Sequence, residues 1–371
     1  MNEKYRWKLT EFYANEEAFA KDTLVLVDEV EKFVKLRGQI GLCADNLLYA
    51  LTSFSNILGK ASYILSYGTL LIRESNSAVN NMVGATCSSI YNGAIMATSF
   101  ISTEICDISD ETLEKYFKVC GEPLTQYRQY VADVRKKQCG LSEFQLSKII
   151  MAKSNIETAR EMHKILISGD LPLNEIIGVG GEIIKLTPEN LYLYVNHEAK
   201  EVATQAIAAH LSMYEKSKNI FIYLLNKVIE NRKEIAYLYG YKSAFEYSLV
   251  ESGVTLKLYD AMSDKIKTIL PYKNKKTDLL MEREGITDIN IFTKFNSSEV
   301  KIPFKFEEAI AIIRNSILIL GDDYVNRFDR GLESNWVDAF PREGKHPRSV
   351  CRSTNGIHPF VCINYNGDDS Q

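Results

Sequence analysis

Proline, glycine and tryptophan are scarce in this 371-residue chain, which has 8 prolines, 20 glycines and 2 tryptophans. So few turn-forming residues exclude an all-β sandwich, which needs a turn about every ten residues. Long apolar runs are also lacking, because the most apolar stretch, 310–320, is interrupted by Arg314 and Asn315. A helix that spans a bilayer needs about 18 consecutive apolar residues. We therefore expect no membrane segment, and the polar residues 1–17 do not resemble a secretory signal.

Neither sign of charge dominates, since 44 Lys and Arg side chains are balanced by 48 Asp and Glu, for a formal net charge of −4. This balance argues against a nucleic-acid-binding surface, which is normally strongly basic. The cysteines, at positions 43, 87, 106, 120, 139, 351 and 362, are odd in number and form no C-x-x-C pair. Without a signal segment, this spacing predicts reduced thiols and a cytoplasmic protein.

Helical periodicity is the main positive signal. Between Asn15 and Leu36 the apolar residues fall on one helical face, and Asn15 is a suitable cap for the first turn. A second set, from Leu47 to Leu65, recurs every three or four residues and predicts a seam for a neighbouring helix. Segment 196–239 predicts one long helix or two abutting ones. The first face comprises Leu26, Val27, Val30, Phe33 and Val34.

Capping residues mark further helix starts. Ser142 with Gln145, and Ser243 with Glu246, have the spacing of a capping box. Thr187-Pro188 places a cap before a proline at the first helical position. One more apolar stripe, which ends before Gly321, is expected to be buried; it comprises Ile310, Ile313, Ile317 and Leu320.

Two stretches interrupt the helical pattern. In 165–187, glycines and a proline occur without a G-x-x-x-x-G-K-[ST] sequence, which predicts an inter-domain turn rather than a phosphate loop. In 341–367, prolines and glycines flank two short apolar segments and predict a β-hairpin. The expected fold is mainly α, a multi-helical elongated body with one small β-hairpin near the C-terminus. We expect an N-terminal helical lobe over 1–190 and a second lobe over 191–371.

Patterns that would support catalysis or metal binding are incomplete. There is no G-x-S-x-G sequence, and Glu201 follows His197 at the position where a zinc-binding H-E-x-x-H helix has its second histidine. The adjacent carboxylates Asp322-Asp323 and Asp368-Asp369 diverge, which favours caps or solvated turns. The residues therefore predict no catalytic side chain and no metal ligand. One more set lacks the usual zinc-ligand spacing; it comprises His346, Cys351, His358 and Cys362.

Several short segments, in their order along the chain, resemble oligoendopeptidase F of peptidase family M3 (M3B). Near the start, Trp7-Lys8-Leu9 and Phe12-Tyr13 resemble the opening of that family. In the middle, Asn231-Arg232 and Gly240-Tyr241-Lys242-Ser243 resemble its N-x-R and G-Y-x-S segments. Near the end, Gly344-Lys345 resembles its G-K strand. The other matches are residues 140–143, 320–324, 336–338, 358–361 and 364–367.

The resemblance implies the N-terminal part of a zinc metalloendopeptidase that cleaves short peptides. In that family zinc lowers the pKa of a bound water, and the glutamate of an H-E-x-x-H helix accepts its proton. These 371 residues contain no H-E-x-x-H sequence. We therefore expect the second lobe to be the first part of an M3-type peptidase lobe, truncated before the zinc helix, holding no cofactor and inactive alone. Arg348 stands where the family's G-K-x-x-G-A strand has its second glycine.

The same resemblance implies a substrate-docking edge at the hairpin, at which an extended peptide would pair by strand addition; ordinary strand packing is the alternative. Two other roles stay open: a non-catalytic helical module that binds peptides or a partner, and one half of a split metallopeptidase. The expected partners are short peptides, a second copy or a complementing C-terminal chain, without nucleic acid or membrane. The expected substrate-binding residues are Ser349, Val350, Cys351, His358 and Tyr365.

Overall fold

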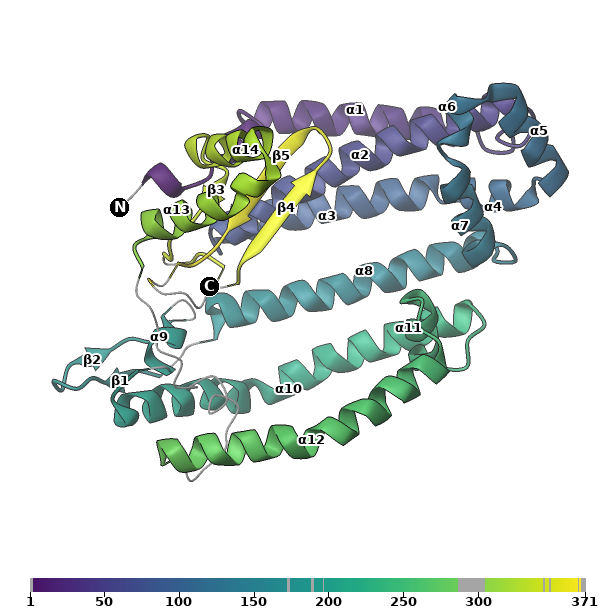
Figure 1. The fold of residues 1–371 in the computed structure, drawn as a ribbon. Helices are drawn as coiled ribbons and strands as arrows, with labels where there is room; N and C mark the ends of the chain where they lie inside the picture. The colour runs from purple at the N-terminus through teal and green to yellow at the C-terminus, as the bar shows by residue number, and fades with distance from the viewer. Residues whose placement is uncertain are drawn as a thin grey trace.

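The structure, a computed structural model, describes residues 3–171, 174–187, 190–195, 197–285, 304–342, 344–346, 348–365 and 367. It is mainly α-helical and elongated, as predicted, because its long helices lie roughly side by side in successive layers (Figure 1). No helix in these ranges is both long and apolar enough to cross a membrane. The long helices are α1 (Glu16–Val34), α2 (Ala44–Glu74), α3 (Ala78–Thr98), α8 (Glu143–Ile165), α10 (Lys200–Leu238) and α12 (Leu256–Glu284).

Helices α1, α2 and α3 build the main core. The side chain of Asn15 caps α1 by accepting from the backbone N–H of Ala18 at 2.9 Å, which confirms the predicted helix start. Helices α2 and α3 approach closely at Gly68, where an added Cβ would lie 2.7 Å from the Cβ of Cys87. The absence of a side chain at Gly68 therefore permits this contact.

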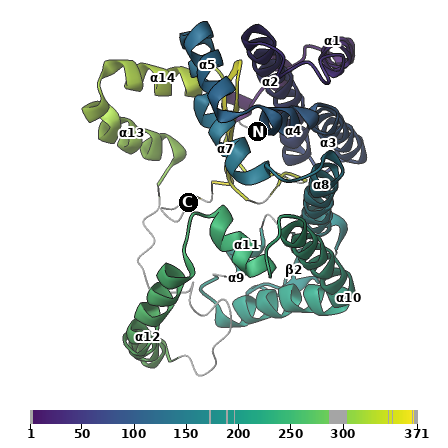
Figure 2. The ribbon, with the colours of Figure 1, turned by 90° about the vertical axis from the view of Figure 1, so that its right-hand side faces the viewer.

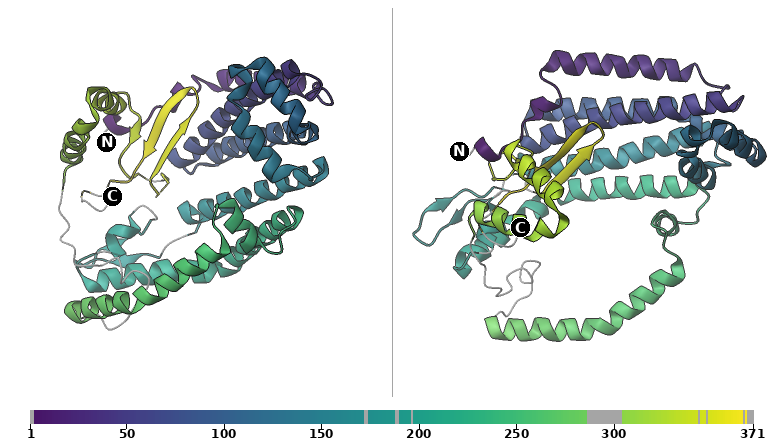
Figure 3. Two further views of the ribbon diagram at one scale, coloured as in Figure 1. Left: turned by 45° about the vertical axis from the view of Figure 1, so that its right-hand side comes forward. Right: turned by 45° about the horizontal axis from the view of Figure 1, so that its top comes forward.

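The predicted apolar face of α1 is only partly buried. Leu26 and Phe33 are 1% exposed, whereas Val27 and Val34 are 47% and 37% exposed. The two valines remain exposed because α1 is an outer helix of its layer (Figure 3), so only one side of its apolar stripe meets α2 and α3.

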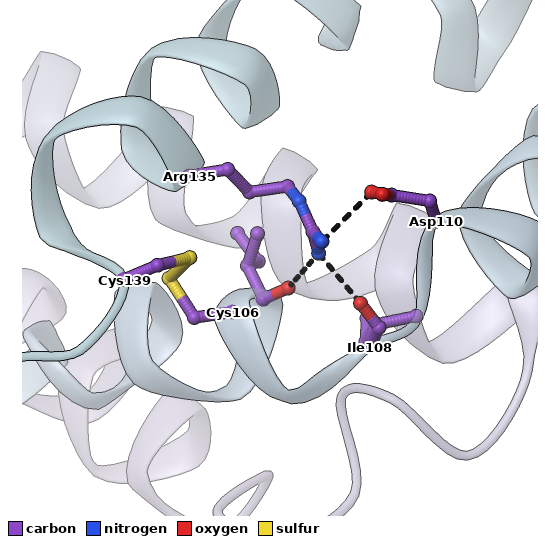
Figure 4. The surroundings of a disulfide bond; sticks show 6 residues. Cys106, Ile108, Asp110, Arg135 and Cys139 are labelled. Atoms are coloured by element: carbon purple, nitrogen blue, oxygen red, sulfur yellow. Dashed lines mark hydrogen bonds and ion pairs between the residues drawn. A yellow bond between two sulfur atoms is a disulfide. The ribbon is translucent and has the colours of Figure 1, made fainter.

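Four shorter helices close one end of the α1–α3 layer (Figure 2). A disulfide joins Cys106 to Cys139, whose Cα atoms lie 5.2 Å apart, and corrects the expectation that every thiol is reduced. Beside it, the Arg135 guanidinium donates to the carbonyl oxygens of Ile105 (3.1 Å) and Ile108 (2.5 Å), as Figure 4 shows. These contacts fasten α7 to the turn after α4. The four helices are α4 (Phe100–Asp107), α5 (Asp110–Cys120), α6 (Glu122–Thr125) and α7 (Arg128–Gln138).

Helices α8 and α10 pack along each other as the next layer. The capping box of Ser142 and Gln145 is present at the start of α8. At α11 only half of the predicted box forms, because the Glu246 carboxylate accepts from the N–H of Lys242 rather than Ser243. The long helix predicted over 196–239 is confirmed as one helix, α10, which begins at Lys200. The neighbouring elements are η3 (Leu166–Asp170), α9 (Leu191–Val195) and α11 (Ala244–Glu251).

The glycine-rich stretch 165–187 holds a hairpin that the sequence did not predict. Strand β1 (Ile176–Ile177) pairs antiparallel with β2 (Ile183–Ile184), and the N–H of Gly178 donates to the carbonyl of Glu182 within the turn. The structure therefore has a second small hairpin in addition to the one expected near the C-terminus. Two predicted features, Pro188 at a helix start and the Asp368-Asp369 pair, lie outside the described residues.

The apolar stripe before Gly321 is not buried as predicted. Ile313 and Leu320 are 48% and 59% exposed, and Ile310 and Ile317 are half-buried. The prediction was wrong because periodicity shows that a helix is amphipathic but not what covers its apolar face. The last elements are α13 (Phe306–Ile317), η4 (Leu318–Leu320), α14 (Asp322–Glu333), β3 (Val337–Asp338), β4 (Val350–Thr354) and β5 (Ile357–Cys362), and near the N-terminus lie η1 (Glu3–Tyr5) and η2 (Leu9–Glu11).

Candidate functional site

The C-terminal strands form a sheet in the order β3-β5-β4, in which β4 is an edge strand. The predicted hairpin is confirmed: β4 pairs antiparallel with β5, with Val350 opposite Cys362 and Arg352 opposite Phe360. Along β4, Cys351 is exposed whereas Val350 and Arg352 are half-buried toward α2. Among the described residues no strand pairs with the other side of β4. The edge is therefore a template for an added strand.

A buried lysine holds the sheet together. The Lys345 side chain is fully buried, and its Nζ donates to Asp338 Oδ1 (2.8 Å) and to the carbonyl oxygens of Asp338 (3.1 Å), Phe340 (2.8 Å) and Ile363 (2.6 Å). Burial lowers the pKa of the Lys345 ammonium, which its bond to Asp338 opposes. Because the acceptors belong to β3 and to the segments after β3 and β5, Lys345 fixes how the strands meet.

The end of helix α2 is bonded to the loop before β4. The backbone N–H of Asn76 donates to the Gly344 carbonyl at 2.7 Å, and the N–H of His346 donates to the Arg73 carbonyl at 3.0 Å. Gly344 has φ of +76°, a left-handed conformation that favours glycine. Helix α2 thus positions the entry to the edge strand.

His346 is a buried, neutral acceptor at this junction. Its Nδ1 lies 3.2 Å from Arg73 Nη1 and accepts from the backbone N–H of Arg348 at 3.1 Å. Burial, followed by the nearby charge of Arg73, lowers the pKa of His346 to about 4. The imidazole is therefore uncharged at neutral pH, so the positive charge at this position comes from the arginines.

The five expected substrate-binding residues do not lie together. Ser349 and Cys351 are exposed at the start of β4, next to half-buried Val350. His358 lies near the turn end of β5, where its Nε2 is 2.7 Å from Glu11 Oε2 and its ring stacks on Trp336. The Tyr365 hydroxyl donates to the Phe304 carbonyl at 2.6 Å. Ser349, Val350 and Cys351 thus lie at the edge strand. His358 and Tyr365 instead contact other parts of the chain.

No described group of three or more His, Cys, Asp and Glu side chains is arranged to hold a metal ion. Two cysteines of the hairpin were among the residues that lack the usual zinc-ligand spacing. Cys351 on β4 is exposed, whereas Cys362 on β5 is buried, and burial raises the pKa of the Cys362 thiol. His197 Nδ1 accepts from the N–H of Ala199 at 3.1 Å, a local contact within the chain turn before α10. The residues that the structure describes therefore do not fit a zinc site.

Sequence reasoning missed two arginines that border the edge strand. Arg352 Nε donates to Ser66 Oγ at 3.1 Å, and Ser66 lies on α2 together with Arg73. Seven residues separate Ser66 from Arg73, which places them on one face of the helix. Nothing in the local sequence marks α2 as the neighbour of β4, so no signal in one sequence identifies this pair.

A hollow of about 500 Å³, lined by no residue of the edge strand, lies between α8 and α10. Asn155 Nδ2 donates to Asn231 Oδ1 at 3.2 Å within it, and Lys227 pairs with Glu230 at 2.9 Å. Because these polar groups satisfy one another, the hollow presents no cluster poised for catalysis.

Comparison with known proteins gives consistent relatives, although no family model matches the chain. It is 21% identical over 366 residues to oligopeptidase PepF of Bacillus subtilis, covering 98% of this chain and 54% of PepF. It is 19% identical to group B oligopeptidase PepB of Streptococcus agalactiae, covering 98% of this chain and 61% of PepB. The chain thus spans between about half and three-fifths of these relatives.

Solved structures share the fold. The crystal structure of oligoendopeptidase F from Enterococcus faecium matches with a TM-score of 0.72 and 22% identity, over 85% of this chain and 60% of that one. A putative oligoendopeptidase F from Bacillus anthracis matches with a TM-score of 0.65 and 13% identity, over 98% of this chain and 63% of that one. The arrangement of helices and terminal sheet is therefore shared with these proteins.

Proposed function

The chain is related to the oligoendopeptidase F-like peptidases along nearly its whole length, and on this premise we propose that it forms the peptide-docking part of such an enzyme. The free edge of β4, held in place by α2 and by Lys345, is the observation that carries the proposal. An extended peptide would add to β4 through backbone hydrogen bonds, which recognise a peptide with little regard to its side chains.

Hydrolysis, in this proposal, needs residues that these 371 do not supply. In the related peptidases' chemistry, a zinc ion would activate a water molecule for attack on the scissile carbonyl. The 371 residues contain no H-E-x-x-H sequence, and the described residues contain no alternative ligand cluster. We therefore expect the chain to bind peptides without cleaving them.

The test uses the 371-residue chain with added zinc and a mixture of short peptides. We expect saturable binding, no cleavage above the protein-free rate, and no zinc retained after gel filtration. Turnover that a chelator abolishes, with one zinc per chain, would show that the chain is itself a peptidase. Loss of binding in a chain with proline at Cys351, which removes an N–H from the edge strand, would support β4 as the docking site. The matched control is Glu16→Pro, at the exposed first position of α1 and outside the sheet, where a helix tolerates proline.

A second role, one half of a split metallopeptidase, is favoured by the large apolar surface on α12, where no described side chain is buried. A complementing C-terminal chain or a second copy of this chain would cover it. Mixing with the part of PepF that the match does not cover, expressed separately, should restore chelator-sensitive cleavage if the chain acts as a half enzyme. We further propose that the protein acts on peptides rather than on nucleic acid or membranes, and in the cytoplasm, where the bond between Cys106 and Cys139 would be an exception to the reduced thiols of that compartment.

A further inference from the structure

We propose that three arginines beside β4, namely Arg73, Arg348 and Arg352, form a site for the carboxylate of a docked peptide. This inference rests on the proposed peptide docking and adds the chemical class of ligand that the edge strand selects. Its basis is that these residues come together from separate segments and that no described carboxylate pairs with them.

The closeness of these residues follows from three contacts. Arg73 and Arg348 both contact His346 Nδ1, through a guanidinium at 3.2 Å and a backbone N–H at 3.1 Å respectively. Arg352 reaches α2 at Ser66, on the helix face that also carries Arg73. One helix and the start of one strand thus bring three cations to the entry of β4.

Most arginines of this molecule have a described acidic partner, and these three do not. Burial lowers the pKa of Arg73, and the described acid whose charge raises it is Glu161 of α8, which also pairs with Lys164 at 2.5 Å. His163 and His346 face the same group, but burial, the largest cause, lowers the pKa of both. Arg232 and Arg330 likewise have no described carboxylate partner, whereas eight other arginines do; these are Arg6, Arg37, Arg128, Arg135, Arg160, Arg314, Arg327 and Arg342.

Unpaired cations at close range repel one another, and a carboxylate relieves that repulsion while accepting forked hydrogen bonds from guanidinium groups. Half-burial strengthens this repulsion at Arg73. Desolvation lowers the pKa of the Arg73 guanidinium, and the charges of Arg352 and Arg348 lower it further. Arg348 is exposed at the end of this group, and no described carboxylate pairs with its guanidinium.

Position along the strand sets the direction of the peptide. Arg348 precedes β4, which runs from Val350 to Thr354. A peptide that pairs antiparallel to β4 brings its C-terminal end toward Arg348, whereas a parallel peptide brings its ammonium there. The arginines therefore favour antiparallel docking, and a strand of this length accommodates about five peptide residues.

The experiment measures the dissociation constants of three dye-labelled hexapeptides for the 371-residue chain by fluorescence anisotropy. One peptide has a free C-terminal carboxylate, the second is its C-terminal amide, and the third is an amide with glutamate as its last residue. We expect the free acid to bind about tenfold more tightly than the amide, as for a charged hydrogen bond. If the glutamate peptide binds as tightly as the free acid, the site accepts side-chain and C-terminal carboxylates alike. If it binds as weakly as the plain amide, the site accepts only the carboxylate of the chain terminus.

Two variants separate the site from folding effects. Arg348→Glu should abolish the preference for the acid, and Arg348→Gln should reduce it, with unchanged circular dichroism because the side chain is exposed. The matched control, Arg327→Glu, reverses an exposed charge on α14 and should keep the preference. Equal binding of acid and amide, unaffected by Arg348→Glu, would overturn this inference while leaving docking intact. Failure of all three peptides to bind would overturn the proposed docking itself.

Discussion

Helices α1–α3 and helix α12 are both rich in apolar side chains, yet among the described residues only the first group buries them. Phe33 is 1% exposed and lies between the rings of Phe54 and Phe100, at 6.2 and 5.3 Å. On α12, by contrast, Ile266 and Ile269 are 55% and 53% exposed. The difference shows that apolar content alone does not identify a core, because burial needs a partner surface as well as a stripe.

The largest expected effect tests this contrast directly. Phe33→Ala should lower the free energy of unfolding by about 3–5 kcal/mol, because it leaves a cavity among packed rings. Ile266→Ala should change it by less than about 0.5 kcal/mol, since the side chain is mostly exposed. Urea denaturation followed by circular dichroism measures both. A large loss from Ile266→Ala would mean that α12 is covered in solution.

A second prediction extends the comparison to pH. His346 has a pKa of about 4 in the folded chain and about 6.5 when unfolded. Between these values the unfolded chain binds a proton that the folded chain does not, so stability falls as the pH is lowered from 6.5 to 4. The loss from this residue should reach about 3 kcal/mol, at 1.4 kcal/mol per pKa unit.

The measurement is the unfolding free energy at pH 7 and pH 4.5 for the native chain and for His346→Gln. His163 and His210 also have lowered pKa values and contribute the same sign. The informative quantity is therefore the difference between the two slopes. Identical slopes would show that His346 is protonated or exposed in the folded protein.

The smallest expected effect concerns two helical glycines of the first group. Gly68→Ala should destabilise the protein by about 1–3 kcal/mol, because its Cβ would overlap that of Cys87. Gly93→Ala, in α3, meets nothing within 4 Å and should stabilise the protein by about 0.5–1 kcal/mol. Thermal melting of both variants tests the pair, and tolerance of Gly68→Ala would indicate that α2 and α3 are farther apart than described.

Much of the fold was predictable, since it depends on neighbours in sequence. The caps at Asn15 and Ser142 and the hairpin of β4 and β5 follow from local residue types. The bond between Cys106 and Cys139 was not predictable, because their spacing of 33 residues has no local signature. The candidate site was also predictable only in part. Residues Ser349–Cys351 were predicted from a family resemblance, whereas the nearness of Arg73 to Arg348 depends on tertiary packing that one sequence does not reveal.

The first residues of the chain pack against some of the last. The Ala339 N–H donates to the Tyr5 carbonyl at 3.0 Å, Asn335 Nδ2 donates to the Lys4 carbonyl at 2.9 Å, and the rings of Tyr5 and Phe306 lie 4.8 Å apart. During synthesis at ~5–20 residues per second, the amino-terminal segment waits on the order of half a minute for these partners to leave the ribosome. Until then it is exposed to chaperones and proteases, so the abundance of the protein in the cell will depend on how well that segment is protected.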